Sequence, residues 1–250
     1  MENNMDYTSP GLIEEIIAEL SNLLKDDPQN HVLWFDYGNA LMNAFYYDKA
    51  LEAYEKAIKL EDNVKFHLSK GIALHSLMRY DEAILEYNKV LDKVNKYPDV
   101  YFRLGLAYAK TDKSDQAIEQ YIKALDINPD YVDALYHLAE MYKEIGMYLE
   151  SLEIFKKIVD DHIILKQETV DLTLVHYDLA YLYTGKALFD DAIKHLERVA
   201  FTHPEYADVH YKLGKLYKKK GDIPKAMIEF EKAIRINPNY KDARDEYWNL

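Results

Sequence analysis

Lysines crowd one short stretch near the end of the chain. Five of them fall within nine residues: Lys212, Lys215, Lys218, Lys219 and Lys220. Ammonium groups gathered this closely attract carboxylates. They could therefore hold an acidic peptide or a terminal carboxylate. The alternative is a basic face that only contacts solvent.

The sequence shows no recognisable catalytic site. It contains no cysteine, which removes disulfides, thiolate nucleophiles and cysteine-based zinc sites. It also has no glycine-rich phosphate loop, no serine nucleophile motif and no His-Glu-x-x-His zinc motif. The nine histidines lack the spacing of metal ligands, so we expect no metal and no other cofactor. These features predict a protein that is not an enzyme.

The charge of the chain is acidic and uneven. The net charge is −13, with −9 in residues 1–64 and +3 in residues 207–250. Nucleic-acid binding needs clustered basic residues along a face, so we expect no nucleic-acid partner. The polar N-terminus does not resemble a secretory signal, and no apolar run is long enough to cross a bilayer. The sequence therefore predicts a cytoplasmic protein with no membrane insertion.

Small residues recur along the chain and indicate an internal repeat. The first series is Gly38, Gly71, Gly105, Ala139, Ala180 and Gly214. Twelve residues after each comes a second small residue: Ala50, Ala83, Ala117, Ser151, Ala192 and Ala226. Four residues further on stands a ring or a leucine: Tyr54, Tyr87, Tyr121, Phe155, Leu196 and Phe230. This spacing predicts pairs of helices whose backbones approach closely at the small residues.

The repeat resembles the tetratricopeptide repeat (TPR). The steps between the first small residues are 33, 34, 34, 41 and 34 residues, and the family period is about 34. Family marks include Trp34-x-x-Tyr37-Gly38 and the closing Asn128-Pro129. The resemblance implies an all-α, right-handed superhelical solenoid of about six helical hairpins with terminal capping helices.

The repeat boundaries divide the chain into five segments. We expect a tail and capping helix in residues 1–30, repeats one to four in 31–165, and an insertion in 166–172. Repeats five and six follow in 173–240, and a capping helix in 241–250. The stretch from 161 to 173 could be a tolerated insertion that lengthens a helix or forms a loop, or it could be a hinge or contact site.

The resemblance also implies that the first helix of each hairpin lines a concave face. Candidate partner-binding residues on that face are Phe35, Asn39, Leu68, Ile72, Phe102, Leu106, Tyr136, Tyr177, Tyr181, Tyr211, Lys215, Lys218 and Lys219. Five of them form an apolar strip on repeats one to three: Phe35, Leu68, Ile72, Phe102 and Leu106. Exposed apolar patches commonly mark binding surfaces, so the strip is the first candidate and the lysines are the second.

Some family members clamp the terminal carboxylate of chaperones with five polar residues. Only Asn39 and Arg103 match that pattern here, while Phe35, Ser69 and Asp99 do not, so we reject this specificity. Three histidines stand where the family prefers a large apolar residue: His67, His176 and His210. We expect them to pack inside the hairpins.

These features lead to three functional hypotheses. The first is a protein-binding adaptor or scaffold that holds a peptide or a helix in the concave groove. The second is head-to-tail self-assembly between the acidic first quarter and the basic last repeat, which would make a homo-oligomer. The third is an accessory subunit of an enzyme complex.

Overall fold

The computed structural model of the protein describes residues 10–160 and 172–250. Within these residues the secondary structure consists of fourteen helices and no strand. The helices fall into two compact units, one ending at Pro129 and one running from Asp130 to Leu250. The predicted all-α class is confirmed.

Seven of the described helices lie in each unit. The first unit contains α1 (Pro10–Asp26), α2 (His31–Asn43), α3 (Tyr47–Leu60), α4 (Val64–Ser76), α5 (Tyr80–Lys93), α6 (Pro98–Ala109) and α7 (Ser114–Ile127). The second unit contains α8 (Val132–Glu144), α9 (Tyr148–Asp160), α10 (Leu172–Gly185), α11 (Phe189–Thr202), α12 (Ala207–Lys219), α13 (Ile223–Ile236) and α14 (Lys241–Trp248).

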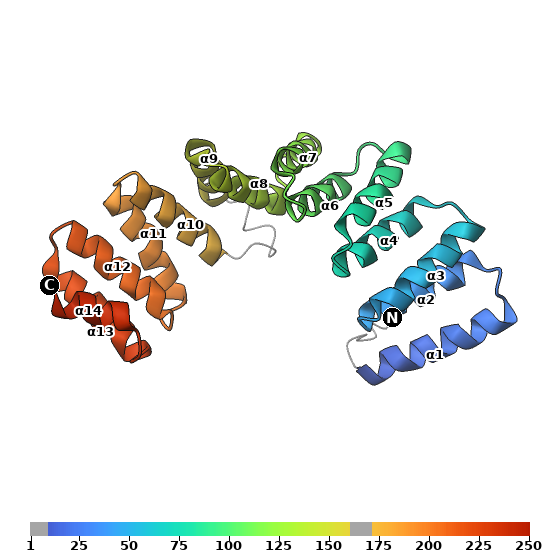
Figure 1. Ribbon diagram of the computed structural model, residues 1–250, viewed down its shortest axis with the longest axis horizontal. Helices are drawn as coiled ribbons and strands as arrows, with labels where there is room; N and C mark the ends of the chain where they lie inside the picture. Colours follow the sequence, from blue (N-terminus) through green and yellow to red (C-terminus); the bar gives the residue numbers. More distant parts are fainter. Residues whose placement is uncertain (1–9, 161–171) are drawn as a thin grey trace, which may run out of the picture. The chain divides into compact units, whose positions relative to one another are not determined.

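Within each unit, helices that follow one another in the chain pack together. In the first unit α2 lies against α3, α4 against α5, and α6 against α7; in the second, α8, α10 and α12 lie against α9, α11 and α13 (Figure 1). These six pairs are the hairpins that the spacing of small residues predicted. Asparagine side chains begin two of the first helices, because Asn30 and Asn63 accept hydrogen bonds from the free N–H groups of α2 and α4.

The repeated small residues and rings form the core of the hairpins. All six residues of the second small series are fully buried, from Ala50 to Ala226. The aromatic rings that follow them are buried to the same degree: Tyr54, Tyr87, Tyr121, Phe155 and Phe230. Four of these rings fill the space next to a glycine of the partner helix, which explains why the two series keep a constant separation.

Four glycines allow the first helix to approach the ring of the second. A Cβ atom added at Gly71 would lie 2.5 Å from Cε1 of Tyr87, and one at Gly38 would lie equally close to Tyr54. A real Cβ cannot come this near to a ring carbon. The glycines are therefore required by the close approach of the two helices.

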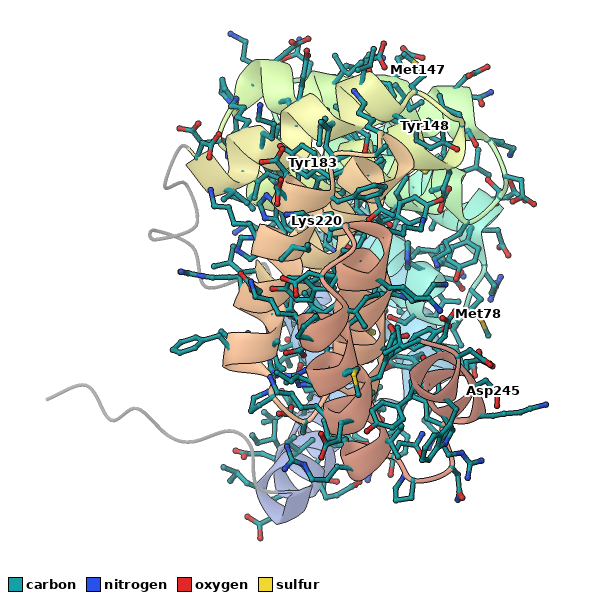
Figure 2. The ribbon with its side chains drawn as sticks, turned by 90° about the vertical axis from the view of Figure 1, so that its left-hand side faces the viewer. Met78, Met147, Tyr148, Tyr183, Lys220 and Asp245 are labelled. Atoms are coloured by element: carbon teal, nitrogen blue, oxygen red, sulfur yellow. The ribbon has the colours of Figure 1, made fainter. Side chains whose placement is uncertain are left out.

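The turn inside each hairpin has the same geometry in all six repeats. Seven residues after the first small residue, the backbone adopts a positive φ: Phe45, Met78, Asp112, Gly146, Ala187 and Gly221. Glycine fills this position in only two repeats. Met78 shows the consequence clearly, since it is 74% exposed and lies at the surface in an unfavourable left-handed conformation (Figure 2).

Helices α1 and α14 pack against the outer hairpins of their own units. Helix α1 buries Leu24 next to α2, and the hydroxyl of Tyr46 donates a hydrogen bond to Glu14 over 2.9 Å. Helix α14 packs on α13 through Ala243, whereas Trp248 is 79% exposed. These placements agree with capping helices, whose role stays a prediction.

The predicted insertion at 166–172 lies outside the described residues, apart from Leu172, which begins α10. Among the helices of the two described stretches, none has the length and apolar character needed to cross a bilayer.

Candidate functional site

The predicted apolar strip lies in the first unit and is largely engaged in packing. The rings of Phe35 and Phe66 have centroids 4.7 Å apart. Leu68 and Ile72 pack against the buried cluster of the second hairpin. All five side chains are half-buried: Phe35, Leu68, Ile72, Phe102 and Leu106. Only part of each of these side chains is therefore exposed for contact with a partner.

Asn39 lies beside the strip and is bonded inside the same hairpin. Its amide oxygen accepts a hydrogen bond from the hydroxyl of Tyr54 over 2.8 Å. Together with Met42 and Ile72 it lines a hollow of about 350 Å³. The Asn39 oxygen thus already has a partner within the protein.

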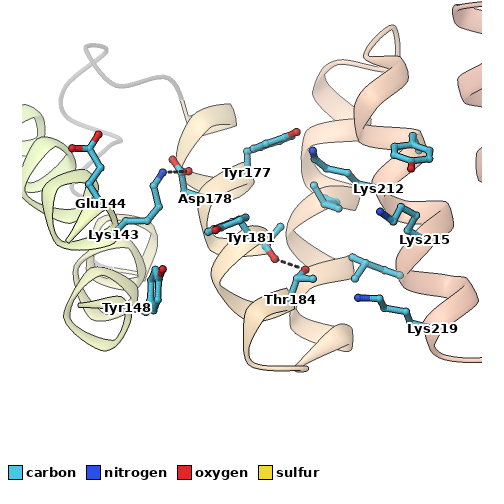
Figure 3. A pocket seen from close by; sticks show the side chains of 14 residues that line it. Lys143, Glu144, Tyr148, Tyr177, Asp178, Tyr181, Thr184, Lys212, Lys215 and Lys219 are labelled. Carbon is cyan, nitrogen blue, oxygen red and sulfur yellow. Dashed lines mark hydrogen bonds and ion pairs between the residues drawn. The ribbon is translucent and has the colours of Figure 1, made fainter. Parts of the chain in front are cut away.

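A larger pocket, of about 670 Å³, lies in the second unit between α8, α10 and α12 (Figure 3). It brings together five of the predicted contact residues: Tyr177, Tyr181, Tyr211, Lys215 and Lys219. The residues outside that set that also line it include Lys143, Tyr148, Asp178 and Lys212. The aromatic row and the basic cluster, which the sequence treats as separate candidates, therefore meet in one place.

Helical periodicity explains why these side chains share a wall. Tyr211, Lys215 and Lys219 follow one another at steps of four residues, which places them on one side of α12. Tyr177 and Tyr181 repeat the same pattern on α10. The opposite sides of both helices are buried in the hairpin cores, so the polar and aromatic sides must face the pocket.

Two lysines of the pocket have no carboxylate partner among the described residues. The Nζ atom of Lys215 lies 5.3 Å from the ring centroid of Tyr211, and that of Lys219 lies 5.6 Å from the ring centroid of Phe189. Both lysines are exposed. A contact with an aromatic face orients an ammonium group without neutralising it, so these two charges remain open to an anionic ligand.

The other two lysines of the pocket are paired with acids. Lys212 forms an ion pair with Asp208 at 3.1 Å. The Nζ atom of Lys143 lies 2.5 Å from Glu140. It also lies 2.7 Å from Asp178 (Figure 3). Their charges are thus largely satisfied inside the protein.

Burial and hydrogen bonding act in opposite directions on the pKa values of Lys143 and Asp178. Burial raises the pKa of Asp178 to about 6, although the hydrogen bond with Lys143 acts to lower it. Burial also acts to lower the pKa of Lys143, but hydrogen bonds with Asp178 and Glu140 outweigh it and raise this pKa above its ordinary value. Both groups are charged at neutral pH, and mild acid neutralises the Asp178 side chain.

Asp208 connects the helices that form the pocket walls. One of its oxygens accepts a hydrogen bond from the hydroxyl of Tyr177 on α10. The other accepts from the hydroxyl of Tyr240, just before α14, over 3.0 Å. Burial acts to raise the pKa of Asp208, but hydrogen bonds from Tyr177 and Lys212 outweigh it, so this pKa falls below its ordinary value. These bonds hold α10 and α12 in a fixed arrangement.

A second hollow of about 1000 Å³ continues the pocket toward the start of α9. It is lined by Met147, Tyr148 and Leu149, and it shares Tyr148, Tyr181 and Lys219 with the first pocket. Met147 and Tyr148 lie at the surface of the second unit (Figure 2). The two hollows together form one continuous surface that combines aromatic and aliphatic side chains with the lysines Lys186, Lys215 and Lys219 and the carboxylates of Glu144 and Glu150.

Two predicted contact residues of the second unit do not line these hollows. Lys218 donates a hydrogen bond to Glu246 over 2.8 Å and so belongs to the contact between α12 and α14. The ring of Tyr136 packs edge-on against Phe155, with centroids 5.8 Å apart.

Sequence reasoning did not single out Tyr148 or Asp178. Tyr148 begins α9, which is the second helix of its hairpin, and only first helices were considered for the concave face. Asp178 stands two residues before Ala180, just as Lys212 stands two residues before Gly214. Charged residues at the same repeat position in adjacent hairpins could have indicated a shared wall.

Among residues 10–160 and 172–250, no three His, Asp or Glu side chains converge in a way that would hold a metal ion.

Sequence comparisons identify the same repeat along most of the chain. Profiles described as tetratricopeptide repeat match residues 31–64, 98–131, 121–153 and 207–240, and a profile described as TPR repeat matches residues 71–112. A TPR repeat-containing protein of Methanocaldococcus jannaschii is 35% identical over 96 residues, which is 38% of this chain and 27% of that protein. Superkiller complex protein 3 of Homo sapiens is 26% identical over 106 residues, 42% of this chain and 7% of that protein.

The chain thus spans less than a third of the length of either relative. Among solved structures, the C-terminal part of a TPR repeat-containing protein from Cytophaga hutchinsonii matches with a TM-score of 0.78 at 16% identity, covering 94% of both chains. At that identity the likeness concerns the fold alone. The profile matches between residues 31 and 240, the small residues in register and the hairpin fold together show that this chain belongs to the tetratricopeptide repeat family.

Proposed function

We propose that this protein is a non-catalytic interaction scaffold whose second unit holds an acidic segment of a partner protein. The family fold supports the general role, because TPR proteins bind other proteins. One observation carries the proposal: Lys215 and Lys219 face a pocket, and neither has a carboxylate partner among the described residues.

The pocket favours a ligand that is both acidic and apolar. Lys215 and Lys219 stand one helical turn apart, so their side chains begin about 6 Å from each other. Two carboxylates of one peptide segment, or one terminal carboxylate, can reach both. Tyr181 is 60% exposed opposite them and presents an aromatic ring. An apolar or aromatic side chain of the partner would pack against this ring.

The apolar strip of the first unit is the weaker candidate surface. Its five side chains are half-buried and several pack within the hairpins, so a partner would remove less apolar area from water there. The strip residues remain proposed contacts of second rank: Phe35, Leu68, Ile72, Phe102 and Leu106.

Head-to-tail self-assembly through the basic last repeat would have fewer unpaired lysines available than the sequence indicates. Lys218 pairs with Glu246, Lys220 pairs with Asp190, and Lys212 also has an acidic partner. Only two of the five clustered lysines are thus free of ion pairs with described residues.

The test starts from the full chain. Partners captured on immobilised wild-type protein are identified by mass spectrometry, remade in pure form, and measured by titration calorimetry against wild type and the Lys215→Glu plus Lys219→Glu variant. We expect the double variant to weaken binding at least tenfold, because two attractive contacts become repulsive. Raising the salt concentration should weaken binding to the wild type as well.

The matched control reverses two exposed lysines outside the pocket, Lys156 and Lys241. It changes the net charge by the same amount and should bind nearly as wild type. Equal affinity of the pocket variant and this control would remove the lysines from the site. A loss only in the Ile72→Glu plus Leu106→Glu variant would assign binding to the strip of the first unit instead.

A further inference from the structure

Three of the six hairpins contain a buried histidine at the same repeat position. Each stands four residues before the first small residue and faces the residue nineteen positions later, on the second helix. In repeats two and six that residue is a glutamate: Nδ1 of His67 lies 2.6 Å from Glu86, and Nδ1 of His210 lies 2.6 Å from Glu229. Repeat five differs, because the facing residue is a second histidine.

Repeat five brings two imidazoles into direct contact. The Nδ1 atoms of His176 and His195 lie 2.8 Å apart, so one nitrogen must donate a proton and the other must accept it. The ring of His195 also stacks on Tyr183, with centroids 5.6 Å apart and an angle of 10° between the planes. His176 is buried, which leaves little room for water to replace the contact.

The two kinds of pair respond differently to acid. A glutamate accepts a hydrogen bond from either a neutral or a protonated imidazole, and a positive charge on the imidazole strengthens that bond. Two imidazoles keep their bond when one proton is added, because it binds the outer Nε2 atom of the donating ring and leaves the Nδ1–H between the rings in place. A second proton leaves two donors facing each other and places two positive charges side by side, away from water.

The surrounding charges do not offset this repulsion. The charged groups that act on the pair are Asp160 on α9 and Asp191, Lys194 and Arg198 on α11. The pKa of His195 is lowered to about 4, mainly by burial and then by the neighbouring His176 and Lys194, while Asp191 and Asp160 act to raise it. Burial is also the main cause of a lowered pKa at His176, and Arg198 and Lys194 add to it.

The sign of the effect on stability follows from these directions. In the unfolded chain both histidines take up protons near pH 6.5. In the folded hairpin they take them up only at lower pH, so the unfolded form binds more protons throughout the interval between. Stability from neutral imidazoles is therefore complete above pH 6.5 and is lost as the pH falls toward 4.

We propose that the His176–His195 pair makes repeat five an acid-sensitive hairpin, in which α10 and α11 separate locally when the surroundings become mildly acidic. Helix α10 carries Tyr177, Asp178 and Tyr181 of the pocket wall. Local opening of this hairpin would therefore dismantle the pocket.

The test is hydrogen exchange followed by mass spectrometry on the full chain at pH 7 and pH 5, with rates corrected for the intrinsic effect of pH. We expect the opening equilibrium constant of the α10–α11 amides to rise about twentyfold, which is the difference in protonation of a single group between pKa 6.5 and 4. The α12–α13 amides, with His210 and Glu229, serve as the internal control and should change much less.

A variant distinguishes protonation of the imidazole pair from other effects of low pH on the protein. His195→Glu recreates the pairing of repeats two and six, and it should remove most of the change at α10–α11. The inference is overturned if wild-type α10–α11 opening is the same at both pH values, if α12–α13 opens equally, or if the variant keeps the full change.

NMR titration of the imidazoles in the wild-type chain provides a second reading that does not depend on the variant folding. The His176 signal should report a pKa below the ordinary imidazole value, and the His195 signal a pKa of about 4. Titration of both signals near pH 6.5 would contradict the proposal.

Discussion

Ser151 is a polar residue at a repeat position that otherwise holds a small apolar residue. The other five repeats place alanine there, and Ser151 is fully buried. Its hydroxyl has no hydrogen-bond partner among the described residues. A buried hydroxyl that loses its bonds to water costs about 1 kcal/mol or more.

Replacing this serine should therefore stabilise the protein. We expect Ser151→Ala to increase the free energy of unfolding by about 1 kcal/mol, seen as a higher midpoint in urea with an unchanged slope. The reverse change in another repeat, Ala117→Ser, should lower the midpoint. A destabilised Ser151→Ala variant would mean that the hydroxyl has a partner.

Asp178 gives a second prediction at the scale of one residue. Because its pKa is raised to about 6, folding favours the protonated form of this side chain. Wild type therefore loses stability relative to Asp178→Asn as the pH rises from 4 to 7. The difference should reach about 1 kcal/mol or more, since one unit of pKa shift corresponds to about 1.4 kcal/mol.

The measurement compares urea unfolding of the two proteins at several pH values, so that other titrating groups cancel. A difference that does not vary with pH would show that the Asp178 carboxylate is not desolvated in the folded state.

At the scale of the helices, the close approach within each hairpin explains why the repeat can be read from the sequence. Contact between Gly71 and Tyr87 depends on residues only sixteen positions apart, so the spacing itself carries the information. The same holds for the histidines, which sequence reasoning placed correctly inside the hairpins.

This packing predicts a coupled pair of substitutions. Gly71→Ala places a methyl group against the ring of Tyr87 and should cost about 1–3 kcal/mol of stability. Repeat five combines Ala180 with Leu196 at these positions. Adding Tyr87→Leu should therefore cost less in the Gly71→Ala background than in wild type, measured as a double-mutant cycle. Additive effects would show that the methyl group and the ring do not meet.

The turns show where the sequence was less informative. Glycine occupies the turn position only at Gly146 and Gly221, whereas Phe45, Met78, Asp112 and Ala187 adopt the same positive φ without being glycine. These four residues keep the strained left-handed backbone conformation because the hairpin packing on both sides fixes the turn. Composition alone could not identify them, but their constant distance from the small residue could.

Replacing Met78 at the strained turn by glycine should increase stability. We expect Met78→Gly to stabilise the first unit by up to about 1 kcal/mol, because the left-handed backbone then costs nothing and the lost side chain is mostly exposed. Glu52→Gly, at an exposed position inside α3, should instead destabilise by about 1 kcal/mol. Thermal unfolding of the three proteins checks both signs, and a lower midpoint for Met78→Gly would contradict the strain.

At the scale of the whole molecule, the sequence predicted the fold class and the family but not the choice between two surfaces. That choice depends on partners far apart in the chain. Phe35 packs against Phe66, thirty-one residues away, which reduces the exposure of the apolar strip. Lys218 is neutralised by Glu246, twenty-eight residues away, which removes it from the basic cluster. Periodicity placed these side chains on faces of helices, while only the folded contacts show which remain free.

Partner binding in the pocket of the second unit can be detected by replacing Tyr181 with a photoreactive benzophenone amino acid and irradiating the full chain with its purified partner. Phe102 in the first unit, given the same replacement, is the comparison. We predict a strong crosslink from position 181 that is lost in the Lys215→Glu plus Lys219→Glu background, and little from position 102. A crosslink from position 102 alone would contradict the account.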